Sequence, residues 1–72
     1  MKIKYYRDAD SLYIELSSNP SATSEEVSQG IVLDYDVAGN ITGIDTDNAS
    51  MKIDLGEVVL SHVPAEIGTL TA

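Results

Sequence analysis

Residues 2–16, KIKYYRDADSLYIEL, decide the fold. Leu12, Ile14 and Leu16 alternate with Tyr13 and Glu15, and a period of two is typical of a half-buried β-strand. The same alternation of apolar and polar residues runs through the residues before the two aspartates. Two strands joined by a short polar segment predict a β-hairpin.

The register of this hairpin follows from keeping the apolar side chains on one face, since a slip of one residue moves every side chain to the other face. A loop one residue longer would place both lysines of the first strand among the aliphatic residues of the second. A loop of residues 7–10 instead pairs Tyr5 with Leu12, and it places Lys2 opposite Glu15. We therefore predict the second register.

A second hairpin is predicted for GIVLDYDVAGNITGIDT, residues 30–46. Residues 36–39 suit a type I turn with the glycine in the left-handed conformation. Tyr35 then lies opposite Ile41 and Leu33 opposite Gly43. This register places on one face Ile31, Leu33, Tyr35 and Ile41, and on the other Val32, Asp34, Asp36, Thr42 and Ile44.

The rest of the chain is less regular. The segment after the first hairpin is rich in Ser, Asn and Pro and is predicted to be loop up to about Ala22. TSEEV fits either a helix-capping box or a strand, and we favour a strand over about residues 22–27, because Gly30 would end a helix too early. A further short strand is predicted within residues 57–63, stopped by Pro64, and fraying is predicted for the final GTLTA.

These elements predict a mainly β fold: a small antiparallel meander of two long hairpins plus short strands, with a short C-terminal helix or edge strand. Residues 1–72 form one small domain, with a hairpin core over 1–50 and a variable extension over 51–72. A domain of 72 residues buries only roughly 60% of its unfolded surface. Because the chain has no Cys and a single His, we expect neither disulfides nor a structural zinc. Self-association is the remaining way to stabilise so small a domain, so we expect a homodimer.

Charge narrows the classes of partner. The net charge is −8, and three of the four basic residues lie within the first seven positions. Such a surface repels phosphate backbones, so we expect the chain not to bind nucleic acid. A basic protein is the more favourable partner for an acidic chain. No segment resembles a signal peptide or a membrane span, so we expect no membrane contact and a cytoplasmic location.

Candidate chemistry rests on carboxylates. Asp8 and Asp10 could ligate Ca²⁺ or Mg²⁺, but Asp is also a usual hairpin-loop residue because it caps backbone N–H groups, and we favour the turn. Asp45 and Asp47 begin a segment like a calcium loop. However, its sixth position is Ser50 where Gly is required, so at best a weak site is expected.

Asp34 and Asp36 could form an acid–base pair if one were desolvated, and His62 could act as a base. Nothing in the sequence supplies the burial or a nucleophile beside the histidine. We therefore predict no catalytic residues, no cofactor and no enzymatic activity.

The stretches KIKYYRDADSLYIELS and EEVSQGIVLDYDVAGNITGID resemble the DUF2283 family of short prokaryotic proteins over roughly residues 1–50. The matching positions are Ala9, Asp10, Leu12, Tyr13, Ile14, Glu25, Glu26, Val27, Gly30, Asp34, Tyr35 and Asp36. The resemblance implies no established activity. Some members are similar to the small partner in toxin–antitoxin gene pairs, which implies a role in protein interaction by analogy only.

We therefore predict a non-catalytic module that binds protein, either itself or a basic partner. The interaction-face candidates are Tyr13, Val32, Asp34, Asp36 and Ile44. Two alternatives stay open: a weak divalent-metal site or carboxylate-based enzyme, and a structural accessory protein without a dedicated partner.

Overall fold

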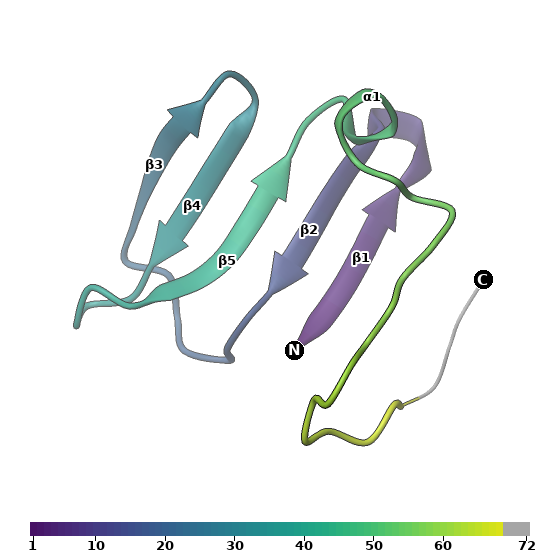
Figure 1. Cartoon of the computed structure of the whole chain (residues 1–72). Coiled ribbons are helices and arrows are strands. Elements are labelled where there is room, and N and C mark those ends of the chain that lie inside the picture. Colours follow the sequence, from purple (N-terminus) through teal and green to yellow (C-terminus); the bar gives the residue numbers. More distant parts are fainter. Residues whose placement is uncertain (69–72) are drawn as a thin grey trace.

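The computed structural model describes residues 1–68 and consists of one open antiparallel sheet followed by a short helix and an extended tail (Figure 1). The mainly β antiparallel prediction is confirmed. The strands are β1 (Lys2–Tyr6), β2 (Ser11–Glu15), β3 (Thr23–Ser28), β4 (Ile31–Tyr35) and β5 (Ile41–Thr46). Within residues 1–68, no helix is long and apolar enough to cross a membrane.

The strand order is β1-β2-β5-β4-β3, which is not the order of a simple meander. Strands β3, β4 and β5 follow one another as predicted, but β5 then pairs with β2, so that Leu12 lies opposite Thr46 and Glu15 opposite Gly43. The polar segment between β2 and β3 crosses from the middle of the sheet to its far edge (Figure 1). β5, the last strand in sequence, therefore joins the β1–β2 hairpin to the β3–β4 hairpin.

The first hairpin has the predicted register, with Tyr5 opposite Leu12 and Lys2 opposite Glu15. Its loop is a single 3₁₀ turn over Arg7–Ala9, and Asp10 closes it in the left-handed conformation (φ 48°). The Lys2–Glu15 ion pair spans 4.0 Å between exposed side chains, so its contribution to stability is small.

The second hairpin confirms the turn and Tyr35 opposite Ile41, but the predicted pairing of Leu33 with Gly43 is wrong. Gly39 has φ 86°, as the bulged turn requires. Beyond the turn the register shifts: Gly43 lies opposite Asp34 and Ile44 opposite Leu33. The shift is a β-bulge, an extra residue on β5, and it moves Ile44 from its predicted face to that of Leu33.

The register defines two faces. The apolar face, as named here, carries Ile3, Tyr5, Leu12, Ile14, Ile31, Leu33, Tyr35, Ile41 and Ile44. The polar face carries Lys2, Lys4, Tyr6, Ser11, Tyr13, Glu15, Ser24, Glu26, Val32, Asp34, Gly43 and Asp45.

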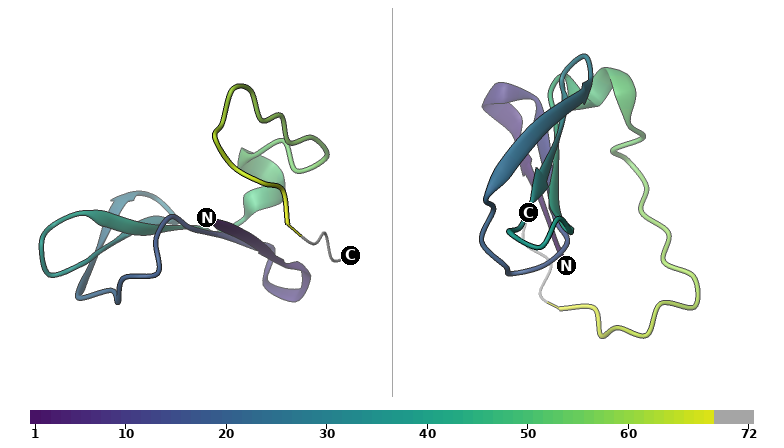
Figure 2. Two further views of the ribbon diagram at one scale, coloured as in Figure 1. Left: turned by 90° about the horizontal axis from the view of Figure 1, so that it is seen from below. Right: turned by 90° about the vertical axis from the view of Figure 1, so that its left-hand side faces the viewer.

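Helix α1 (Ala49–Lys52) follows β5, and the tail after it contains no strand within the described residues. The strand predicted within residues 57–63 is therefore wrong. Figure 2 shows the reason: the tail rises out of the plane of the sheet on one side, so its backbone cannot join the hydrogen-bond ladder of β1. Apart from Gly68, the predicted fraying concerns residues outside the described part of the chain.

The core is small. Among the described residues, the buried apolar side chains are Leu12, 7% exposed, and Ala49, fully covered. Strand β4 is half-buried along its whole length. The sheet is thus a single layer whose apolar face is covered in part.

Candidate functional site

The carboxylate of Asp10 joins the first hairpin loop to α1. It accepts hydrogen bonds from the Tyr5 hydroxyl at 2.7 Å, the Ser50 hydroxyl at 2.6 Å and the Ser50 backbone N–H at 3.0 Å. The Asp10 carbonyl also accepts from the Ala49 N–H at 2.9 Å. The Ser50 hydroxyl, followed by the Tyr5 hydroxyl, lowers the Asp10 pKa. Asp10 therefore occupies the turn in the left-handed conformation, but its carboxylate joins the hairpin to α1 instead of capping N–H groups of the loop.

The other three candidate metal ligands, Asp8, Asp45 and Asp47, differ in their positions and hydrogen bonds. Asp8 lies in the 3₁₀ turn, while Asp45 in β5 accepts a hydrogen bond from the Ser11 hydroxyl at 2.9 Å. Asp47 follows β5, and its backbone N–H donates to Gly30 at 2.8 Å. Over residues 1–68, no three His, Asp or Glu side chains are grouped so as to hold a metal ion.

A hydrogen-bond network crosses four strands on the polar face. The Tyr13 hydroxyl of β2 passes over Gly43 of β5 and donates to one Asp34 oxygen at 2.7 Å. The Ser24 hydroxyl of β3 donates to the other Asp34 oxygen at 2.6 Å. The hydrogen bond to Asp34 raises the pKa of Tyr13 from 10.0 to about 12, so the phenol stays a donor at pH values where an ordinary tyrosine ionises.

Asp36 stabilises the turn of the second hairpin. Its carboxylate accepts from the backbone N–H groups of Ala38 and Asn40 at 3.0 and 2.9 Å, and from the Asn19 side chain at 3.2 Å. The Asn40 N–H is the main cause of its lowered pKa. Asp34 and Asp36 thus have different partners, and the geometry does not make them an acid–base pair.

The five predicted interaction residues do not share one surface. Tyr13, Val32 and Asp34 lie on the polar face, Ile44 lies on the apolar face, and Asp36 belongs to the turn. His62 lies in the exposed tail with φ 57°. The bulge moves Ile44 away from the face of Val32 and Asp34, and sequence reasoning missed it.

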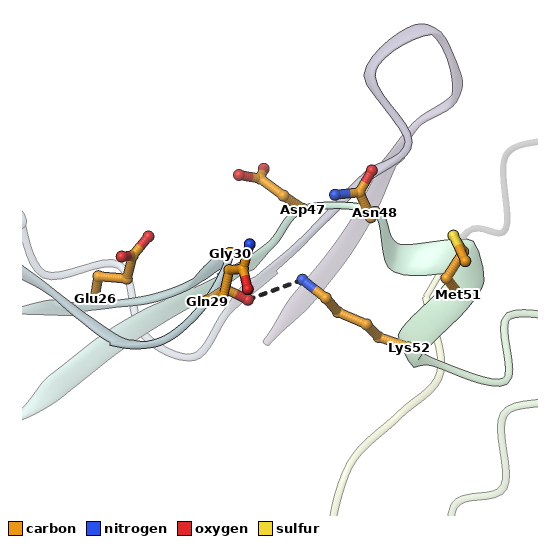
Figure 3. A pocket seen from close by; sticks show the side chains of 7 residues that line it. All are labelled: Glu26, Gln29, Gly30, Asp47, Asn48, Met51 and Lys52. Carbon is orange, nitrogen blue, oxygen red and sulfur yellow. Dashed lines mark hydrogen bonds between the residues drawn. The ribbon is translucent and has the colours of Figure 1, made fainter.

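A shallow pocket of about 530 Å³ opens where the β3–β4 turn meets α1 (Figure 3). Lys52 reaches across it, and its ammonium donates to the Gln29 carbonyl at 3.0 Å. A Cβ on Gly30 would lie 2.6 Å from that ammonium, so a larger residue there would displace it. Glu26 and Asp47 supply two exposed carboxylates at the rim. The pocket combines one ammonium with two carboxylates in contact with solvent, which makes it polar and open.

A larger groove of about 780 Å³ lies on the apolar face over β1 and β2. The sheet contributes four side chains, Ile3, Tyr5, Leu12 and Ile14, and the tail contributes Ile53, Leu55 and Val58. Arg7, Asp54 and Glu57 complete its lining. The tail thus lies over the β1–β2 half of the apolar face, as Figure 2 shows from below, although Ile3 and Tyr5 stay 49% and 44% exposed in the groove.

The fold and its side-chain hydrogen bonds define a small single-sheet domain with one apolar face and one polar face. A family profile described as "Protein of unknown function (DUF2283)" matches residues 2–50, which hold all five strands, and the chain belongs to this family. Neither the curated proteins nor the solved structures give a match to this chain.

Sequence reasoning missed two side-chain contacts, that of Tyr13 with Gly43 and Asp34 and that of Asp10 with Ser50, although the sequence carries a signal for the first. A Gly inside a strand often marks a close approach by another group, and Gly43 is such a position. The partner, Tyr13, could be identified only once the pairing of β2 with β5 was known. The Asp10–Ser50 contact joins residues 40 positions apart and has no local signal.

Proposed function

We propose that this chain is a non-catalytic protein-interaction domain. The observation that carries the proposal is the apolar face over β4 and β5. Ile41 is 40% exposed there, and Ile31, Leu33 and Ile44 are partly exposed, although all four are aliphatic and lie in or next to the central strand. An apolar sheet face is normally covered by a second layer, and contiguous exposed apolar surface marks an interaction site.

The setting of the carboxylates supports a non-catalytic role. Asp10, Asp34 and Asp36 each accept at least two hydrogen bonds from donors of the protein itself. A carboxylate held in this way has few acceptor sites left for a substrate or a metal. These three residues therefore support the structure of the sheet and its loops.

A basic protein is a second candidate partner, and it would bind the polar face. Glu26, Asp34 and Asp45 lie on that face, while its lysines are confined to the edge strand β1. Binding there would be electrostatic and would weaken as salt is raised. An antitoxin-like role rests on family analogy alone.

The test is native mass spectrometry of the full chain isolated from its own cells, beside Leu33→Glu and Val32→Glu. These neighbours on β4 are both half-buried but face opposite sides, so Val32→Glu is the matched control. We expect wild type and Val32→Glu to carry a stoichiometric polypeptide, a second copy or another protein, and Leu33→Glu to lose it. A folded wild-type chain isolated with no polypeptide bound would refute the proposal.

Metal-dependent chemistry is tested separately by thermal unfolding of the purified chain. We expect no change in the melting temperature with millimolar Ca²⁺, Mg²⁺ or Mn²⁺. A rise of several degrees, lost in Asp8→Asn or Asp45→Asn, would contradict the non-catalytic proposal.

A further inference from the structure

We propose that the apolar face is covered by a second copy of this chain, so that two sheets pack face to face in a two-fold symmetric dimer. This inference rests on the proposed function and names the partner for one surface. The tail lies over the β1–β2 half and stands in the way of a second sheet there, which leaves as contact surface the half over β4 and β5, centred on Leu33 and Ile44.

The exposed area is large enough for such a dimer. The chain exposes 5875 Å², whereas a compact monomer of 7.7 kDa exposes roughly 4,300 Å². The difference is roughly 1,500 Å², and a standard interface needs about 800 Å² per partner. The extended tail, whose residues 54–68 are all exposed, contributes to this difference, and the total leaves room for an interface of standard size beside it.

The distribution of charge indicates which occupant fits. Two chains of net charge −8 repel each other, so they can associate closely only through a surface that carries few carboxylates. On the strands, the apolar face has one charged residue, Glu25, at the outer strand β3. The remaining strand charges lie on the polar face: Lys2, Lys4, Glu15, Glu26, Asp34 and Asp45.

Symmetry favours a copy over a basic protein at this face. A two-fold interface must be complementary to itself, and a surface that is aliphatic apart from Glu25 on the outer strand β3 meets that condition where Glu25 stays at the solvent-exposed rim. A basic partner would find a single carboxylate on the strands of this face, Glu25 opposite Leu33, and it would be drawn instead to the polar face, whose strands carry four. Sheets stacked in this way lie about 10 Å apart with interdigitating side chains.

The first experiment is sedimentation of the purified full chain at micromolar concentration, alone and without lysate. We expect wild type and Val32→Glu to sediment at twice 7.7 kDa, and Leu33→Glu to sediment as a monomer with its β-sheet circular dichroism retained. A monomeric wild type would overturn the inference, and so would equal dissociation of the two variants.

A second experiment keeps the inference testable if Leu33→Glu does not fold. Because the chain contains no Cys, a single introduced thiol reports one position only. With a short bismaleimide, Ile44→Cys should give a cross-linked dimer in high yield and Val32→Cys, on the opposite face, at least tenfold less. Equal yields, or no dimer for Ile44→Cys, would overturn the inference.

The two proposals fail in different ways. If the purified chain is monomeric but the chain isolated from cells carries another protein lost in Leu33→Glu, the second copy is wrong and the interaction role stands. If neither sample carries a polypeptide, both proposals fail.

Discussion

Replacing Gly43 by Ala should destabilise the wild type but stabilise a variant that lacks the Tyr13 side chain. A Cβ at Gly43 would collide with the Tyr13 hydroxyl and lie 2.6 Å from Cζ of the ring. Since the three nearest atoms all belong to Tyr13, the ring must move and release Asp34. The backbone itself presents no obstacle, because Gly43 does not have a positive φ.

The magnitude follows from two opposing terms. Losing a hydrogen bond to a charged group costs about 1.5–3 kcal/mol, and Ala gains about 0.5–1 kcal/mol over Gly within a strand. We expect Gly43→Ala to lower the free energy of unfolding by about 1–2 kcal/mol, which lowers the melting temperature by roughly 4–16 °C in a domain of this size. In Tyr13→Ala, the same substitution should raise the free energy of unfolding by about 0.5–1 kcal/mol.

The assay is a double-mutant cycle measured by urea unfolding of the wild type, both single variants and the double variant. All four should be measured at one protein concentration, because association couples to unfolding. The reversal of sign corresponds to a coupling of roughly 2 kcal/mol. An equal effect of Gly43→Ala in both backgrounds would refute the contact between Tyr13 and Gly43.

Three further outcomes follow from the structure. Because the pKa of Asp10 lies below its ordinary 3.8, its contribution to stability should be complete above about pH 4 and decline as pH falls through the lowered pKa. Urea unfolding from pH 2 to 5 should therefore show a weaker dependence of stability on pH for Asp10→Asn than for the wild type. Because the pKa of Tyr13 is raised from 10.0 to about 12, its contribution to stability should decline as pH rises between those values. Ultraviolet titration should show one tyrosine that ionises near pH 12 in the wild type and at lower pH in Asp34→Asn. Gly30→Ala should lower the free energy of unfolding by about 1–2 kcal/mol, because φ is 74° there, and Gly30→Asn should cost less in the same urea assay.

The sequence was sufficient wherever one strand pair could be judged by itself. The register of β1 and β2 followed because only one alignment kept Tyr5, Leu12 and Ile14 on a single face. The left-handed Gly39 followed from local turn chemistry. Each inference needed residues close together in the chain.

The errors arose where a distant contact decides the structure. Gly43 within β5 is a weak signal of a bulge, but it does not fix the register on either side, so the shift that moved Ile44 to the apolar face was not predictable from alternation. The apolar run of residues 57–63 has strand-like composition, but a strand also needs a partner with free backbone groups, and the tail lies out of the sheet plane. For the same reason, the predicted interaction residues were split between two faces.

The position of β5 has a consequence for the order of folding. β1–β2 and β3–β4 are local hairpins, but each is joined to the other only through β5, whose residues 41–46 are made last among the strands. An isolated two-stranded hairpin is marginally stable in water. During synthesis, the nascent chain should therefore gain stable tertiary structure in one late step, when β5 leaves the ribosome and pairs with both β2 and β4.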